Sequence, residues 1–303
     1  MSWLIAIPAW GDRCIAHAVR SALPSVQAAL AHAQAQARFV IHTDRPENFF
    51  ALARATLLPL PRERYSRYYA LSDCHRQAIH MAVPGEFVAL INADHVVSLE
   101  AFAAAEKRLH AGKRIVMMSG MRTYAPDEPA PLNMRSRELL AWAWAHRHAT
   151  AEDAIWGSGK STSLSSLYFV DGDDVISRWF HLHPFAFVKE QGLSFNGLTI
   201  DEDLGEYWSR ELVHVVEDAD EAALIERSPA SFMFKSHQRP VQIRDVAYWA
   251  HCDNGYGGKR TTHFHHWLFK HRIVLRGSDR DLGDRAVCDA ILSVIPHAEA
   301  ATA

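Results

Sequence analysis

The residues Asn92-Ala93-Asp94-His95 stand at the end of an apolar run in the stretch FVALINADHVVS. A short run that is apolar throughout is typical of a buried strand in a parallel sheet. A carboxylate and an imidazole directly after such a strand would lie at the carboxyl edge of the sheet, where open α/β folds bind their ligands. The segment therefore predicts a binding or catalytic site, with Asp94 as its first candidate.

Polar residues follow two other apolar runs in the same way. Trp10-Gly11-Asp12 comes after WLIAIPA, and His42-Thr43-Asp44 comes after RFVI. Because parallel strands end at a common edge, we expect the three polar groups to converge there. Asp, Thr and Asn also cap helices, so a purely structural role stays open for these residues.

Strands and helices alternate over residues 1–120, and this alternation predicts an α/β fold with a mostly parallel sheet flanked by helices. We expect helices over about 13–36, interrupted at Pro24, and over 68–81 and 101–110, with strands at 3–9, 38–41, 57–60, 87–91 and 114–119.

The remainder of the chain has a different character but no repeat and no linker, which favours one compact unit with an extended C-terminal half. We expect helices over 136–148 and 284–295, a segment at 198–208 that leads into a helix, strands at 167–170 and 185–188, a strand and turn within 212–225, and a Gly/Ser-rich segment at 155–166.

The order of LIAIPAWGDRCIAHAVRSAL, FVIHTD and EFVALINADHVVSLEAF resembles the nucleotide-binding half of GT-A glycosyltransferases. The resemblance implies a Rossmann-related GT-A-like sheet, with 1–120 as the nucleotide-sugar-binding half and 121–303 as the acceptor half of the same domain. In that family an acidic motif, often Asp-x-Asp, holds Mn²⁺ or Mg²⁺ on the donor diphosphate. In this sequence Asn92 stands at the position of the first acid of that motif, which leaves Asp94 as the ligand.

The same resemblance implies further donor and metal contacts. His251 or His263 would supply a late metal ligand beside Asp94. Arginines near the helix after the third strand could meet phosphate oxygens or simply lie in solvent, and a Gly-rich basic loop at 253–260 could close on phosphate or be a plain turn. The residues implied for donor binding are Pro8, Ala9 and Trp10 at the nucleoside, Asp44 at the base, and Arg67, Arg76, Asn92 and Lys259.

Three consecutive acids, Asp201-Glu202-Asp203, precede a predicted helix. They could complement the helix dipole or supply the general base for an acceptor hydroxyl. Like charges packed together raise at least one pKa, which suits a base that works near neutrality. A Glu-Asp pair followed by a helix and a basic residue, here Arg210, resembles inverting GT-A enzymes; Asp203 is then the first choice for the base and Asp201 the second.

Histidine and aromatic residues give weaker signals. His181-x-His183 and His263-x-His265 have strand spacing and are compatible with zinc, but the chain has neither a Cys pair nor an HExxH motif, so we expect most of its 19 histidines to be surface or half-buried. Five aromatic residues could form an acceptor platform, and we expect at least half of them to be core: Trp142, Trp144, Trp156, Trp179 and Phe180.

Composition excludes several classes of protein. A chain of 303 residues that is 49% apolar can bury a sizeable core. Its net charge of −3 gives no basic field for nucleic acid. Four scattered cysteines without a CxxC pair favour the cytoplasm. No apolar run reaches the roughly 20 residues of a membrane span, and MSWLIAIPAW lacks a basic signal-peptide region; a peripheral place at the inner membrane face stays open.

These observations predict a metal-assisted glycosyltransferase that moves a sugar from a nucleotide-diphosphate donor to a glycan or small-molecule acceptor, with a role in polysaccharide biosynthesis allowed. Inversion is implied by the resemblance alone. A catalytically inactive nucleotide- or sugar-binding protein of the same fold is one alternative, and Asn92 supports it. A nucleotidyltransferase is another, although AWGDRC, with one Gly, is a poor match for the Gly-rich basic loop of such enzymes.

Overall fold

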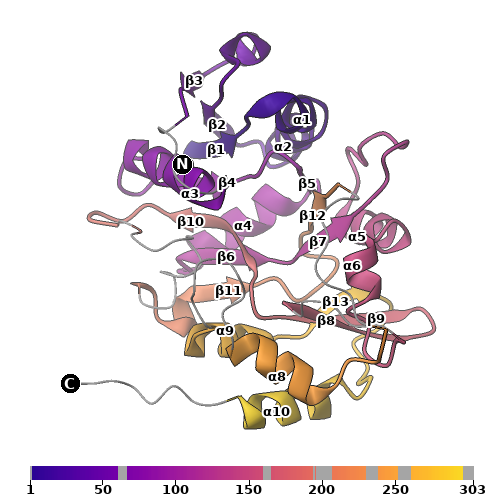
Figure 1. Ribbon diagram of the computed structural model, residues 1–303. Coiled ribbons are helices and arrows are strands. Elements are labelled where there is room, and N and C mark those ends of the chain that lie inside the picture. The colour runs from indigo at the N-terminus through magenta and orange to yellow at the C-terminus, as the bar shows by residue number, and fades with distance from the viewer. Residues whose placement is uncertain are drawn as a thin grey trace.

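The computed structural model describes residues 2–60, 67–159, 165–193, 195, 207–229, 238–251 and 261–295. A seven-stranded sheet forms its centre, in the order β11-β6-β10-β4-β1-β2-β3 (Figure 1). Six strands run parallel and β10 alone runs antiparallel, between β4 and β6. The predicted α/β fold with a mostly parallel sheet is confirmed. The strands are β1 (Ser2–Pro8), β2 (Gln36–His42), β3 (Ala55–Leu58), β4 (Phe87–Leu90), β6 (Ile115–Met118), β10 (His183–Val188) and β11 (Val213–Val215).

The strand order reverses between β1 and β4. From β1 the chain adds β2 and β3 on one side, and then places β4 on the other side of β1. In open α/β sheets, ligands bind outside the carboxyl ends of the strands at such a point of reversal. The fold therefore directs attention to the residues that follow β1 and β4.

Alternate residues of β1 face the two sides of the sheet, as the two-residue period of a strand requires. Trp3, Ile5 and Ile7 pack into one core and Leu4 and Ala6 into the other. The first core includes α1 (Gly11–His17), the π-helical turn η1 (Ala18–Ala22), α2 (Leu23–His32) and α4 (Ala101–His110), and the second includes α3 (Arg67–Met81).

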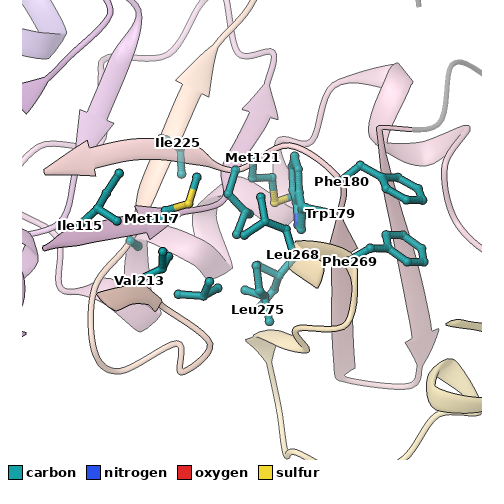
Figure 2. Packing of buried hydrophobic residues seen from close by; sticks show 14 of the residues in the cluster. Ile115, Met117, Met121, Trp179, Phe180, Val213, Ile225, Leu268, Phe269 and Leu275 are labelled. Atoms are coloured by element: carbon teal, nitrogen blue, oxygen red, sulfur yellow. The ribbon is translucent and has the colours of Figure 1, made fainter. Parts of the chain in front are cut away.

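The second core joins the two halves of the chain. Figure 2 shows Ile115 and Met117 of β6 packed with side chains from later elements, among them Ile225 and Leu268. Both β10 and β11 of the second half also lie in the central sheet. Both halves of the chain thus contribute side chains to the second core.

Two three-stranded sheets complete the fold, in the orders β5-β12-β7 and β13-β9-β8. None of the helices in the described ranges is long and apolar enough to span a bilayer. The remaining elements are β5 (His95–Val97), β7 (Gly120–Thr123), β8 (Ser166–Asp171), β9 (Asp174–Trp179), β12 (Leu224–Arg227), β13 (Ile273–Arg276), η2 (Pro46–Phe49), η3 (Arg210–Leu212), α5 (Ser136–Ala145), α6 (Ala149–Glu152), α8 (Ile243–His251), α9 (His263–Phe269) and α10 (Asp284–Val294).

Most predicted elements of the described residues are present at nearly the expected bounds. Pro24 lies in the first turn of α2, and the expected interruption of the first helix is the π-helical turn η1. The strand spacing inferred for His263-x-His265 was wrong, because both residues lie on α9, where His265 is buried and His263 is exposed. The expectation that at least half of the five aromatics are core is confirmed by Trp144, Trp179 and Phe180. The segment 198–208, which is expected to lead into a helix, lies almost wholly outside the described residues.

Candidate functional site

The turn between β4 and β5 holds Asn92, Ala93 and Asp94 at the carboxyl end of a fully buried strand. The backbone N–H of His95 donates to the Asn92 carbonyl at 3.1 Å and closes the turn, and the N–H of Arg227 donates to the Asp94 carbonyl at 2.8 Å. Asp94 is therefore held between β4 and β12, with its side chain half-buried.

A second acid, Glu226, lies beside Asp94. In the small sheet Glu226 pairs with His95 across β5 and with Arg122 across β7. Its carboxylate accepts from Arg122 Nε at 3.2 Å and from Ser228 Oγ at 2.9 Å. Burial raises the pKa of Asp94 to about 7, and the charge of Glu226 adds to that shift. We refer to these two acids as the Asp94–Glu226 pair.

The charges of basic side chains act on the Asp94–Glu226 pair. Arg122 and Arg13, the latter on α1, both act to lower the pKa of Asp94, but less than burial and Glu226 raise it. His17 lies in the same neighbourhood, since burial and then the charges of Arg13 and Arg227 lower its pKa. The edge therefore combines two acids with guanidinium groups that suit phosphate oxygens.

The ends of β1 and β2 contribute the predicted nucleoside edge. Ala9 N–H donates to the His42 carbonyl at 2.8 Å, which extends the pairing of the two strands beyond Pro8. The exposed carboxylate of Asp44 accepts from the N–H of Gly11 at 3.1 Å, and Gly11 has a positive φ of 69° at the start of α1. This hydrogen bond stabilises the turn through Trp10 that connects β1 to α1, so Asp44 lies next to that turn.

The other predicted residues are distributed differently. Arg76 pairs with Asp73 of its own helix at 2.8 Å, and Arg67 is the first residue of α3. His251 ends α8 and His263 begins α9, and Figure 1 draws both helices well away from β5. Lys259 and the acids Asp201, Glu202 and Asp203 lie outside the described residues.

Three residues of the site were not anticipated from the sequence: Glu226, Arg122 and Arg13. Glu226 follows the buried pair Leu224-Ile225 just as Asp94 follows the buried β4. An acid after a short apolar run is therefore the signal that could have identified it. Arg122 lies in the four-residue strand β7, and Arg13 on the first helix; neither shows a comparable pattern.

The Asp94–Glu226 pair suits a divalent metal such as Mg²⁺, which proteins usually hold through one or two carboxylates together with substrate phosphates and water. Carboxylate oxygens are hard ligands, and a bound metal would offset the repulsion between the two acids, which Arg122 and Arg13 offset only in part. Within the described ranges, no three His, Cys, Asp or Glu side chains form a group that could hold a metal by themselves.

Comparison with known proteins gives only distant likenesses. No family model and no curated protein matches the chain. S. aureus TarS 1–349 in complex with UDP-GlcNAc is 10% identical with a TM-score of 0.35, over 97% of this chain and 71% of that chain. The inositol-1-phosphate CTP transferase from T. maritima is 10% identical with a TM-score of 0.37, over 77% of this chain and 92% of that chain. With TM-scores this low, these likenesses do not assign the chain to a family.

Proposed function

We propose that the protein is a glycosyltransferase that transfers a sugar from a nucleotide-diphosphate donor to a glycan or small-molecule acceptor, with Mn²⁺ or Mg²⁺. One observation carries the proposal. The Asp94–Glu226 pair lies at the carboxyl end of β4, next to the reversal of strand order, where Arg122 is bonded to Glu226 and the charge of Arg13 acts on Asp94. Acids for a metal and guanidinium groups for phosphate are the two requirements of diphosphate binding.

In this proposal the acids hold the metal and the arginines bind the phosphates. Asp94 would hold the metal, with Glu226 as the neighbouring carboxylate, and the metal would neutralise charge on the departing diphosphate. Arg13 and Arg122 would contact phosphate oxygens and exclude water from them. Of these, Arg13 is exposed on the first turn of α1, where it can swing toward a ligand.

The remaining roles come from the sequence and stay predictions. Residues 1–120 would form the donor half, with the nucleoside at Pro8, Ala9 and Trp10 and the base at Asp44. Residues 121–303 would form the acceptor half. Asp203 is the predicted general base and Asp201 the second choice, with Glu202 as a further catalytic candidate, and inversion is expected from the family resemblance.

Thermal shift with UDP, GDP and CMP, each with and without Mn²⁺, tests the proposal. At least one nucleotide should raise the melting temperature in the presence of metal, and Asp94→Asn and Glu226→Gln should both remove the shift. Asp220→Asn, an exposed acid paired with Arg137 elsewhere, is the matched control and should keep it. The proposal is contradicted if no nucleotide shifts the wild-type melting temperature with metal present.

A non-catalytic binding protein of the same fold is the second candidate, and the environment of Asn92 favours it. The side chain of Asn92 lies against His95, where an acid would be expected in the resembled family. Incubation with a panel of nucleotide sugars separates the two candidates. Nucleotide binding with no release of nucleoside diphosphate from any donor would favour the binding protein. Pyrophosphate release from a nucleoside triphosphate would instead assign a nucleotidyltransferase.

A further inference from the structure

Asn92 contacts His95 through both its backbone and its side chain. The N–H of Asn92 donates to His95 Nδ1 at 3.1 Å, and Asn92 Nδ2 lies 3.2 Å from His95 Nε2. Because Nδ1 accepts, the neutral ring carries its proton on Nε2. Within the described part of the chain Asn92 Oδ1 has no hydrogen-bond partner. A rotation of the side-chain amide by about 180° exchanges Oδ1 and Nδ2, and Oδ1 then accepts the proton on Nε2 of His95.

His95 is in turn supported from β10. Its ring, 2% exposed, meets the ring of His183 edge-on at 4.4 Å between centroids and 85° between planes. His183 Nε2 donates to the carbonyl of Leu90, the last residue of β4, at 2.6 Å. A chain of contacts thus runs from the end of β4 through two imidazoles to Asn92, and we refer to Asn92, His95 and His183 as the imidazole unit.

The imidazole unit and the Asp94–Glu226 pair use successive side chains of one tight turn. Asn92 is directed to His95, whereas the carboxylate of Asp94 is near Glu226, Arg122 and Arg13. The unit contacts the turn on its buried side and leaves the acids at the edge of the sheet. Small changes in the orientation of a reacting group cost large factors in rate or affinity, so the support of this turn has functional weight.

We propose that His95 and His183 are positioning residues that set the conformation of the Asn92–Asp94 turn, and that Asn92 belongs to this unit and is not a metal ligand. The proposal rests on the proposed function, because Asp94 is the group that is positioned. It also accounts for the amide at residue 92. An acid there would bring a third carboxylate next to the Asp94–Glu226 pair.

Asn92→Asp gives the first test, since it restores the acid expected from the family resemblance. A carboxylate at residue 92 would accept from Nε2–H of His95 and stay on the buried side, so affinity for Mn²⁺ should be unchanged or weaker. Repulsion from Asp94 should lower the melting temperature. Titration calorimetry with Mn²⁺ alone and with Mn²⁺ plus UDP measures both affinities. A tenfold tightening of either would overturn the proposal, because residue 92 would then face the metal.

Two substitutions at His95 test the positioning role itself. Asn can place its Oδ1 where Nδ1 accepts from Asn92, whereas Leu fills similar space without an acceptor. We expect His95→Leu to weaken Mn²⁺-dependent UDP binding by about tenfold or more, and His95→Asn to recover most of the loss. His265→Leu is the matched control, because His265 of α9 is also 2% exposed and its Nδ1 accepts from the N–H of Thr262, three residues earlier, at 3.0 Å. Equal binding by His95→Leu and wild type would overturn the proposal.

Amide hydrogen exchange separates a failure of this proposal from a failure of the proposed function, because it needs no ligand. In the unliganded protein, the Asn92 amide should exchange faster in His95→Leu than in wild type, and should be unchanged in His265→Leu. A wild-type protein that binds neither Mn²⁺ nor UDP would contradict the proposed function. Unchanged exchange at Asn92 in His95→Leu would contradict the imidazole unit, whatever the protein binds.

Discussion

Two clusters of this molecule combine acids with arginines, and they differ in the balance of charge. In the first, Asp284 accepts from Arg178 at 2.6 and 2.9 Å and from Arg272 at 2.9 and 3.2 Å, and the carboxylate is fully buried. Burial opposes its ionisation, but hydrogen bonds from Arg272 and Arg178 outweigh that effect and lower the pKa of Asp284. Arg272 also pairs with the exposed Asp279, so every charge in this cluster has its partner.

The Asp94–Glu226 pair is the opposite case. Burial and the neighbouring acid raise the pKa of Asp94 to about 7 in spite of Arg122 and Arg13. The first cluster attaches the first residue of α10 to β9 and to the residue before β13, and is complete without a ligand. The second is half-buried at the sheet edge, and a bound cation would stabilise the ionised form of its acids. Such an imbalance is typical of functional sites, whereas the balanced cluster is typical of a structural one.

The largest effect is expected from breaking the balanced cluster. Asp284→Asn leaves the buried Arg178 without its counter-charge and Arg272 with Asp279 alone, which should lower the free energy of unfolding by about 3–5 kcal/mol. Urea denaturation at pH 7 measures this loss, and the Kd for nucleotide of the protein that remains folded should be unchanged. A loss below about 1 kcal/mol would show that the cluster is not the structural clamp described here.

Asp94→Asn should change the free energy of unfolding in the opposite direction, toward greater stability. The raised pKa means that the folded protein binds this proton more tightly than the unfolded chain, so stability falls as pH rises from about 4 to about 7. Above that window the ionised acid destabilises the fold in full, and the substitution should raise the free energy of unfolding by about 1–2 kcal/mol at pH 8. At pH 4 the difference should vanish. Urea titrations at the two pH values measure it, and destabilisation at pH 8 would refute the imbalance.

The predictable part of the site is the part that depends on local pattern. Short apolar runs that end in polar residues identified β1, β2 and β4, and the structure brings Asp44, Trp10 and Asp94 to the ends of those strands. Helices α3 and α4 were predicted almost to the residue, since their periodicity and their Gly or Pro-Gly endings are local signals.

The proximity of Glu226 to Asp94 was beyond sequence pattern. The two residues meet because β5, β12 and β7, strands of three or four residues, pair across long separations in the chain. Strands this short carry too little periodicity to be recognised, and they exist because tertiary contacts stabilise them. The burial of His95 has the same origin, since the N–H that donates to its Nδ1 comes from the folded turn and the ring that it meets edge-on comes from β10.

His75 is a buried histidine that stays neutral, and it isolates the effect of burial from the charge balance that distinguishes the two clusters. Burial, followed by the charges of His183 and His42, lowers the pKa of His75 to about 3. The unfolded chain therefore binds this proton first, and stability is lost as pH falls from about 6.5 toward 3, by about 1.4 kcal/mol per pH unit once the unfolded-state histidine is protonated. His75→Gln should reduce that slope by one proton. Urea denaturation between pH 7 and pH 4 provides the measurement, and an identical slope in the variant would contradict the expectation.

The smallest effect is expected where charges are balanced but exposed. Arg137 donates two hydrogen bonds of 2.6 Å to the Asp220 carboxylate, a geometry as good as that at Asp284, but both side chains are at least half exposed. Arg137→Ala should cost less than about 1 kcal/mol, and 0.5 M NaCl should reduce even that difference while leaving the Asp284→Asn loss nearly unchanged, because salt screens only the exposed pair. Urea denaturation at low and high salt gives both comparisons. If Arg137→Ala lost as much free energy of unfolding as Asp284→Asn, pairing geometry alone would set the strength of an ion pair. The expected difference assigns that strength to burial. Burial is also what makes the unbalanced charge at Asp94 destabilising in the absence of a ligand.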